Sequence, residues 1–174
     1  DLAASAGFVA EPAEGDIYLR GPRDVRKPVL SNQVILGILV SGFFLFCGVI
    51  LSYGWARAIG FSAAQIQTAA FSAWIFGHIF LAYLSRSQTE SVLKIGPFRN
   101  RIINIWAVSA IGFLIAAVYL PPLRAALHFA PISPVYTIAI ALLMAVIMGL
   151  LELGRRIGFA RLYQPSYRVG RAEG

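Results

Sequence analysis

His78 is the residue of this chain whose type and position could most directly do chemistry. It is the only Asp, Glu, His, Lys or Arg deep inside any of four long apolar runs. An ionisable side chain in such a place commonly faces a helix bundle or a wet cavity, and marks a path for ions or protons. A neutral imidazole that hydrogen-bonds a neighbouring helix is the structural alternative. The sequence leaves both open.

Other polar residues in the apolar runs fit structural roles. Hydrogen bonds between helices are the expected role of four of them, Gln67, Thr68, Ser72 and Ser109. Glu152 and Arg155 are three positions apart, which favours an ion pair at a helix end. Cys47 is the single cysteine and lies in an apolar run, so it can form no internal disulfide and is expected to pack as a small hydrophobe.

Motifs for catalysis are missing from the sequence. It contains no glycine-rich phosphate loop, no cluster of His, Cys and Asp with metal-ligand spacing, and no pairing of a nucleophile with a base. It also offers no polar domain large enough to enclose an active site. The sequence therefore predicts that this stretch holds no catalytic residues and no cofactor of its own.

The four apolar runs predict the elements that must position these residues. They cover residues 33–54, 66–84, 102–120 and 134–153, and a helix of about 20 apolar residues spans the ~30 Å hydrocarbon core of a bilayer. Only 13% of the residues are charged, against about 25% in soluble domains. Buried helices of a soluble bundle would each show a polar face. The prediction is an all-α, integral membrane four-helix bundle.

Basic residues predict the orientation of this bundle. Of the 15 Lys and Arg residues, all but Arg57 and Arg124 fall in the segments 11–32, 85–101 and 154–174. Cytoplasmic loops retain Lys and Arg, so we expect a cytoplasmic link, a cytoplasmic loop and a basic cytoplasmic tail, with both ends inside (N-in/C-in). The predicted location is the cell (plasma) membrane.

The net charge of +7 does not indicate a nucleic-acid partner. The basic residues lie beside the ends of the spans, without the base-stacking aromatics of a nucleic-acid surface. Contact with the lipid bilayer and its anionic headgroups accounts for them. Residues 1–10 are small and apolar but too short to span, and are expected to be the end of a preceding transmembrane helix.

Five collinear segments together resemble a known family. They read D-I-Y-L-R-G-P-R-D-V-R-K-P at 16–28, T-A-A-F-S-A-W-I-F-G-H-I-F-L-A-Y-L-S-R-S at 68–87, P-F-R-N-R-I-I-N at 97–104, Y-L-P-P-L at 119–123 and L-L-E-L-G-R-R at 150–156. In this order and spacing the chain resembles the C-terminal transmembrane domain of a type II, calcium-pump-like P-type cation-transporting ATPase from bacteria. The four runs would be its helices seven to ten, preceded by the end of helix six.

The resemblance implies roles that the residues alone do not. Asp1 matches a cation-ligating Asp of the family's sixth helix, and His78 matches an eighth-helix position where calcium pumps of animal reticulum carry a Glu ligand. Imidazole is a poor substitute for a carboxylate on a hard cation, which leaves the ion and its stoichiometry open and is compatible with proton counter-transport. The implied function is a support domain of a cation pump. Upstream domains of the same polypeptide would use ATP and Mg.

Two alternatives belong to other classes of protein. One is a stand-alone four-helix membrane protein that acts as an interaction partner or scaffold without enzyme activity. The other is a small proton or ion channel that uses His78.

Overall fold

The computed structural model describes residue 9, residues 32–86, residue 96 and residues 98–157. Asp1 and the segments predicted as the end of a preceding helix, the cytoplasmic link and the basic tail lie almost wholly outside these residues. Within the described part the elements are all helices: α2 (Asn32–Ala58), α3 (Ala63–Leu84), α5 (Arg101–Tyr119), α6 (Pro121–Ala126) and α7 (Pro134–Ile157). Helices α2, α3, α5 and α7 are long and apolar enough to cross a membrane. The predicted all-α fold with four such helices is confirmed.

Local sequence signals set where the helices begin. Ser62 caps α3 in a capping box, in which its hydroxyl accepts from Gln65 N–H and the Gln65 side chain accepts from Ser62 N–H. The carboxamide oxygen of Asn100 accepts from the first amides of α5. Helices α6 and α7 each begin with a proline, Pro121 and Pro134, where the missing N–H costs nothing.

Several helix boundaries differ from those expected from the apolar runs. Helix α2 continues past residue 54 to Ala58, because Ala56 is buried in the core and keeps the last turn packed. Helix α3 begins at Ala63, three residues before its apolar run, because the capping box nucleates it there. Helix α7 extends past residue 153 to Ile157. Hydropathy marks the part of a helix inside lipid, whereas the helical hydrogen bonds continue beyond it.

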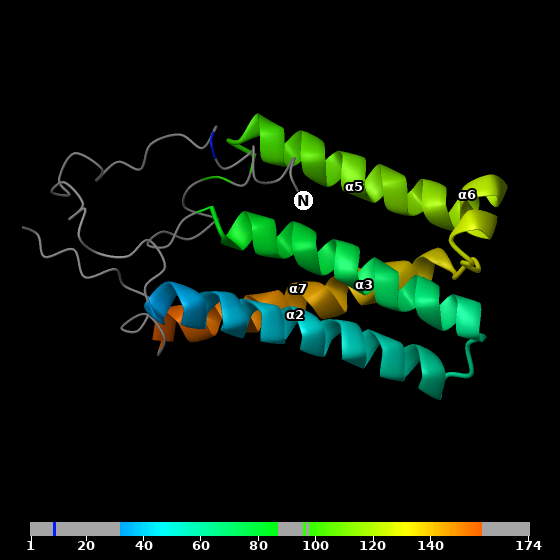
Figure 1. The fold of residues 1–174 in the computed structure, drawn as a ribbon, viewed down its shortest axis with the longest axis horizontal. Coiled ribbons are helices and arrows are strands. Elements are labelled where there is room, and N and C mark those ends of the chain that lie inside the picture. The colour runs from blue at the N-terminus through cyan, green and yellow to red at the C-terminus, as the bar shows by residue number, and fades with distance from the viewer. Residues whose placement is uncertain (1–8, 10–31, 87–95, 97, 158–174) are drawn as a thin grey trace, which may run out of the picture.

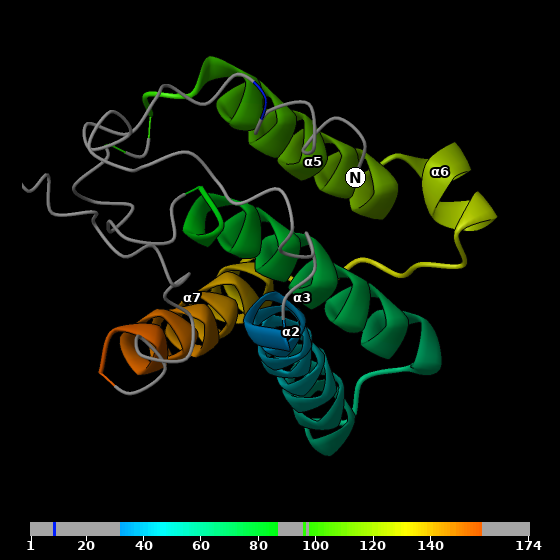
Figure 2. The same ribbon diagram turned by 60° about the vertical axis from the view of Figure 1, so that its left-hand side comes forward.

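Helix α3 occupies the centre of the bundle. It packs against α2, α7 and α5, and Figure 1 shows it between α5 on one side and the α2–α7 pair on the other. The turned view in Figure 2 separates α5 from α2 and α7. Accordingly, 44% of the apolar window of α3 is buried inside the protein, against 11% for α2. The rest of the apolar surface faces outward, as lipid-facing helices require.

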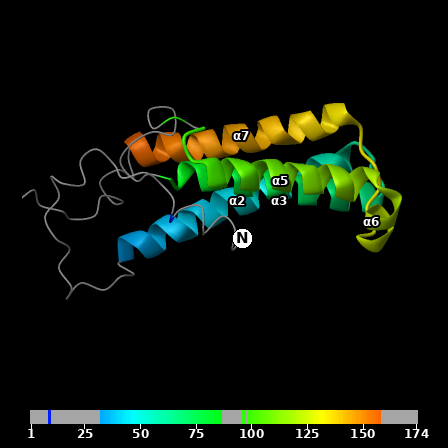
Figure 3. The same cartoon turned by 90° about the horizontal axis from the view of Figure 1, so that it is seen from above.

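Two hydrophobic clusters share α3. The larger lies between α2, α3 and α7 and includes Ala69, Ala73, Ile140, Met144 and Met148. The smaller joins α3 to α5 through buried residues that include Ile79 and Leu114. Figures 1 and 3 show that the four long helices run roughly side by side, with α6 at one end of the bundle. The ends of α3 and α7 and the starts of α2 and α5 lie at the other.

Candidate functional site

His78 lies half-buried on α3 and is held by its own helix. Its Nδ1 lies 3.0 Å from the carbonyl oxygen of Trp74, one turn earlier, and the two rings are 4.4 Å apart between centroids. A carbonyl can only accept, so we assign the proton of the neutral ring to Nδ1. Nε2 then keeps a free lone pair. The imidazole is oriented by α3 itself, and does not require a partner on a neighbouring helix.

Gly77, next to His78, lies where side chains of α2 and α7 pack against α3. A Cβ atom at Gly77 would collide with Leu45 of α2 and would come within 2.6 Å of Met144 Cε of α7. A Cβ at Gly48 of α2 would come within 2.5 Å of the sulfur of the same Met144. Glycine at both positions therefore lets the Met144 side chain enter between α2 and α3.

Buried hydroxyls on α2 and α3 bond to backbone carbonyls. Ser52 Oγ donates to Ala69 O at 3.2 Å, which joins α2 to α3, and Ser72 Oγ donates to Thr68 O at 2.7 Å. Ser52, Thr68 and Ser72 are each 0% exposed. In the apolar interior such groups are costly unless bonded, and these bonds satisfy them without any ligand.

Thr68 also anchors the connection between α6 and α7. Its Oγ1 lies 2.9 Å from both Ala64 O and Ala130 O, and accepts from Ala130 N–H at 3.2 Å. Since a hydroxyl has one proton, the two carbonyls share a single donor. Thr68 therefore fixes an irregular segment of backbone to the middle helix, as polar backbone in a membrane protein requires.

Three more side chains fasten the same connection. Each donates to a backbone carbonyl between residues 127 and 132, and the pairs are Gln67 Nε2 with Leu127 O (3.3 Å), Gln65 Nε2 with Pro131 O (3.3 Å) and Tyr119 Oη with Ile132 O (3.1 Å). The Phe129 side chain is buried and its ring lies 5.1 Å from that of Phe71. The connection thus belongs to the packed body of the protein.

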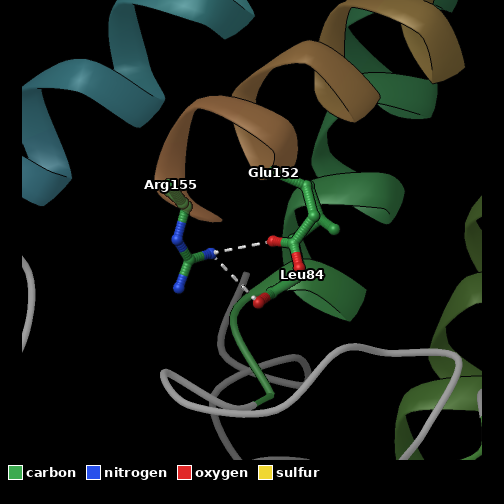
Figure 4. Close-up of polar contacts among 3 residues, drawn as sticks. All are labelled: Leu84, Glu152 and Arg155. Atoms are coloured by element: carbon green, nitrogen blue, oxygen red, sulfur yellow. Dashed lines mark hydrogen bonds and ion pairs between the residues drawn. The ribbon is translucent and has the colours of Figure 1, made fainter. Parts of the chain in front are cut away.

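The opposite end of α3 is joined to α7 by an arginine. Arg155 Nη1 donates to the carbonyl of Leu84, the last residue of α3, at 3.3 Å, and lies 3.7 Å from Glu152 Oε2 (Figure 4). The ion pair expected from the i, i+3 spacing is therefore present. A cation here also compensates the partial negative charge at the C-terminus of α3. The guanidinium thus fastens one helix end to another.

A second polar layer joins α3 to the start of α5. Tyr83 Oη donates to Asn104 Oδ1 at 2.6 Å, and Asn104 Nδ2 donates to Phe98 O at 2.9 Å. Arg86 is 6% exposed and donates to Gly96 O at 3.0 Å. The Tyr83–Asn104 pair was not predicted from the sequence. Its only sign in the sequence is one polar residue near each of two helix ends, which does not show that the two residues meet.

The structure brings some of the predicted polar residues together and separates others. Thr68 and Ser72 are bonded in the interior, whereas Ser109 lies on the exposed side of α5 and its role between helices stays a prediction. Cys47 is a half-buried free thiol. Among the described residues no group of three His, Cys, Asp or Glu side chains could hold a metal ion. Asp1 lies outside the described residues, so its distance from His78 is not defined.

Comparisons with known proteins point to one family. The family model described as "Cation transporting ATPase, C-terminus" matches residues 1–157. The chain is 31% identical over 114 residues to human calcium-transporting ATPase type 2C member 1 and 33% identical over 116 residues to type 2C member 2 of mouse. It is also 32% identical over 95 residues to calcium-transporting ATPase 1 of Schizosaccharomyces pombe. The two type 2C matches cover 66% of this chain but 12% of each relative, and the third covers 55% and 11%.

Proposed function

The chain belongs to the family of cation-transporting ATPase C-terminal domains, and from this membership we propose that its helices support the ion-carrying part of an ATP-driven calcium pump. Four helices able to span a bilayer, together with this family, make it the membrane domain of a P-type cation pump. Calcium enters the proposal from the relatives, which are named calcium-transporting ATPases.

One observation favours a structural role for these helices over a direct role in carrying ions. The buried hydroxyls of Ser52, Thr68 and Ser72 are each bonded to a backbone carbonyl of the bundle. Hard cations need several oxygen ligands that converge on one point, whereas these hydroxyls are each directed at a backbone carbonyl of the bundle. A bundle held together in this way is suited to pack against helices that move ions and to keep its own shape while they move.

Two residues of this chain are proposed as contacts with the cation path. Asp1 would supply a carboxylate oxygen, as the resemblance implies. His78 would present Nε2, because Nδ1 is engaged with the Trp74 carbonyl. Neutral imidazole is not a favoured ligand of a hard cation, so we propose that His78 exchanges a proton during transport instead of binding calcium.

The remaining machinery is proposed for other parts of the same polypeptide. The matched part spans about an eighth of the length of the two type 2C relatives. ATP and Mg would be bound by upstream domains, where phosphoryl transfer would take place. In this scheme the bundle resists the movements of those domains.

Uptake measurements test the proposed function. The polypeptide that carries this chain, reconstituted in vesicles, is expected to accumulate calcium when ATP and Mg are added. Accumulation should stop when ATP is replaced by a non-hydrolysable analogue. Calcium flux that is the same without ATP would favour the channel alternative. The scaffold alternative would be favoured if neither flux nor ATP hydrolysis occurred with calcium or with any other cation tested.

The proposed orientation can be tested by labelling single cysteines. Ser85 and Ser133 are both exposed. Ser85 follows the end of α3 and Ser133 precedes the start of α7, and these two helix ends lie at opposite ends of the bundle. In a polypeptide without other cysteines, including Cys47→Ser, Ser133→Cys is expected to react with a membrane-impermeant maleimide on intact cells. Ser85→Cys should react only after permeabilisation, because basic loops stay in the cytoplasm. The reverse pattern would overturn the N-in/C-in orientation.

A further inference from the structure

A groove runs between α2 and α3 on the side of their connecting turn. It has a volume of about 670 Å³, and its lining includes Val49, Tyr53 and Arg57 of α2 and Gln67, Phe71 and Trp74 of α3. Most of the lining is aliphatic or aromatic. Gln67, Phe71 and Trp74 also make the contacts described above, and the Trp74 ring lies 4.4 Å from that of His78.

A positive charge lies at one end of this groove. Arg57 is exposed in the last turn of α2. Of the acidic residues, the structure describes only Glu152, which lies beside Arg155 at the opposite end of the bundle. Arg57 thus has no carboxylate to neutralise it within the described ranges. Tyr53, one turn deeper on the same face, presents a half-exposed phenol.

The length of the groove matches half a bilayer. Eight residues separate Arg57 from Val49 along α2, which is about 12 Å at 1.5 Å per residue. One leaflet contributes about half of the ~30 Å hydrocarbon core. A molecule with an anionic head at Arg57 and an apolar chain along Phe71 and Trp74 would therefore fill it.

We infer that this groove binds a phospholipid with an anionic headgroup. The guanidinium of Arg57 donates charge-assisted hydrogen bonds to the lipid phosphate, and one acyl chain lies along the groove as far as Trp74. Arg57 distinguishes this site from apolar lipid-facing positions such as exposed Val146 on α7. The inference does not depend on the side of the membrane that Arg57 faces, nor on the proposed pump activity.

Photocrosslinking in the full polypeptide tests the site. Trp74→p-benzoylphenylalanine places a photoreactive ring in the groove, and Phe71→p-benzoylphenylalanine is a second reporter if the first variant fails to fold. After reconstitution in equal amounts of phosphatidylglycerol and phosphatidylcholine, mass spectrometry gives the ratio of the two lipid adducts. We expect about a fivefold preference for phosphatidylglycerol, the factor that one basic side chain contributes at an anionic surface.

Matched variants identify the source of the preference. Arg57→Gln should reduce the ratio to about one, while Arg124→Gln, a cation of α6 outside the groove, should leave it unchanged. The same probe at exposed Val146 should report the bulk composition. Equal ratios at the groove and at Val146 would overturn the inference. Crosslinks from the groove to peptides of the same polypeptide would also overturn it, because protein would then cover the groove.

Discussion

Replacing Asp1 by asparagine is expected to abolish cation-stimulated ATP hydrolysis in the full polypeptide. Asp1 is proposed, from its resemblance to the sixth-helix ligand, to supply a carboxylate oxygen to the transported cation. Asparagine keeps the shape of the side chain but removes its negative charge, and hard cations depend on charged oxygen ligands. Even partners outside the ligand shell of a metal site contribute about 10–100-fold to affinity. We therefore expect the apparent cation affinity to fall by about 100-fold or more, which abolishes the stimulation at cation concentrations that half-saturate the unchanged polypeptide.

The measurement is ATP hydrolysis as a function of free calcium concentration. Asp16→Asn is the matched control, because it removes the same charge from the segment predicted as a cytoplasmic link, and it should leave the calcium dependence unchanged. If Asp1→Asn left hydrolysis and calcium dependence as they are, Asp1 would not be a ligand. Loss of activity in both variants would point to a general effect of charge.

Replacing Gly77 by leucine is expected to give the largest loss of stability in the bundle. A Cβ at this position already meets Leu45 and Met144, and the rest of a leucine side chain would need space that α2 and α7 occupy. Overpacking of a close-packed interior costs about 1–3 kcal/mol, and we expect a value near the upper end because two helices must move. The midpoint of cooperative unfolding in detergent should fall accordingly.

Gly112→Leu is the matched control for this prediction. Gly112 lies in α5, also within a span, and a Cβ there would meet nothing within 4 Å. The same substitution should be neutral, or stabilise by up to about 1 kcal/mol through helix propensity. Equal effects at the two positions would mean that the three helices do not approach closely at Gly77. Unchanged stability of the Gly77 variant would also contradict the structure.

The spans themselves were predictable from the sequence because the bilayer sets their length and polarity. The start of α3 differs from the start of its apolar run, but it is encoded locally, because its capping box depends only on Ser62 and Gln65, three positions apart. The end of α2 could not be predicted in this way. Ala56 is held by packing against other helices, and the hydropathy of one segment does not report such packing.

The candidate site was predictable only in part. His78 could be singled out as a candidate because it is an ionisable residue in an apolar run. Its bond to Trp74 follows from the four-residue spacing of a helix. The bond from Thr68 to Ala130 could not be predicted from the sequence, because Ala130 is 62 positions away in an irregular segment. Whether Asp1 lies near His78 depends on how helices pack, and no pattern along the sequence encodes that.

The Met144 contact has a consequence for how the protein is made. Helices α2 and α3 leave the ribosome before α7 and can pair through their short turn, but the space that Gly48 and Gly77 leave between them stays open until α7 is synthesised. A nascent chain that has inserted α2, α3 and α5 therefore has an unfilled gap between α2 and α3, where the Met144 side chain later packs. Membrane quality-control factors could recognise such an intermediate, and the arrival of α7 would remove the signal.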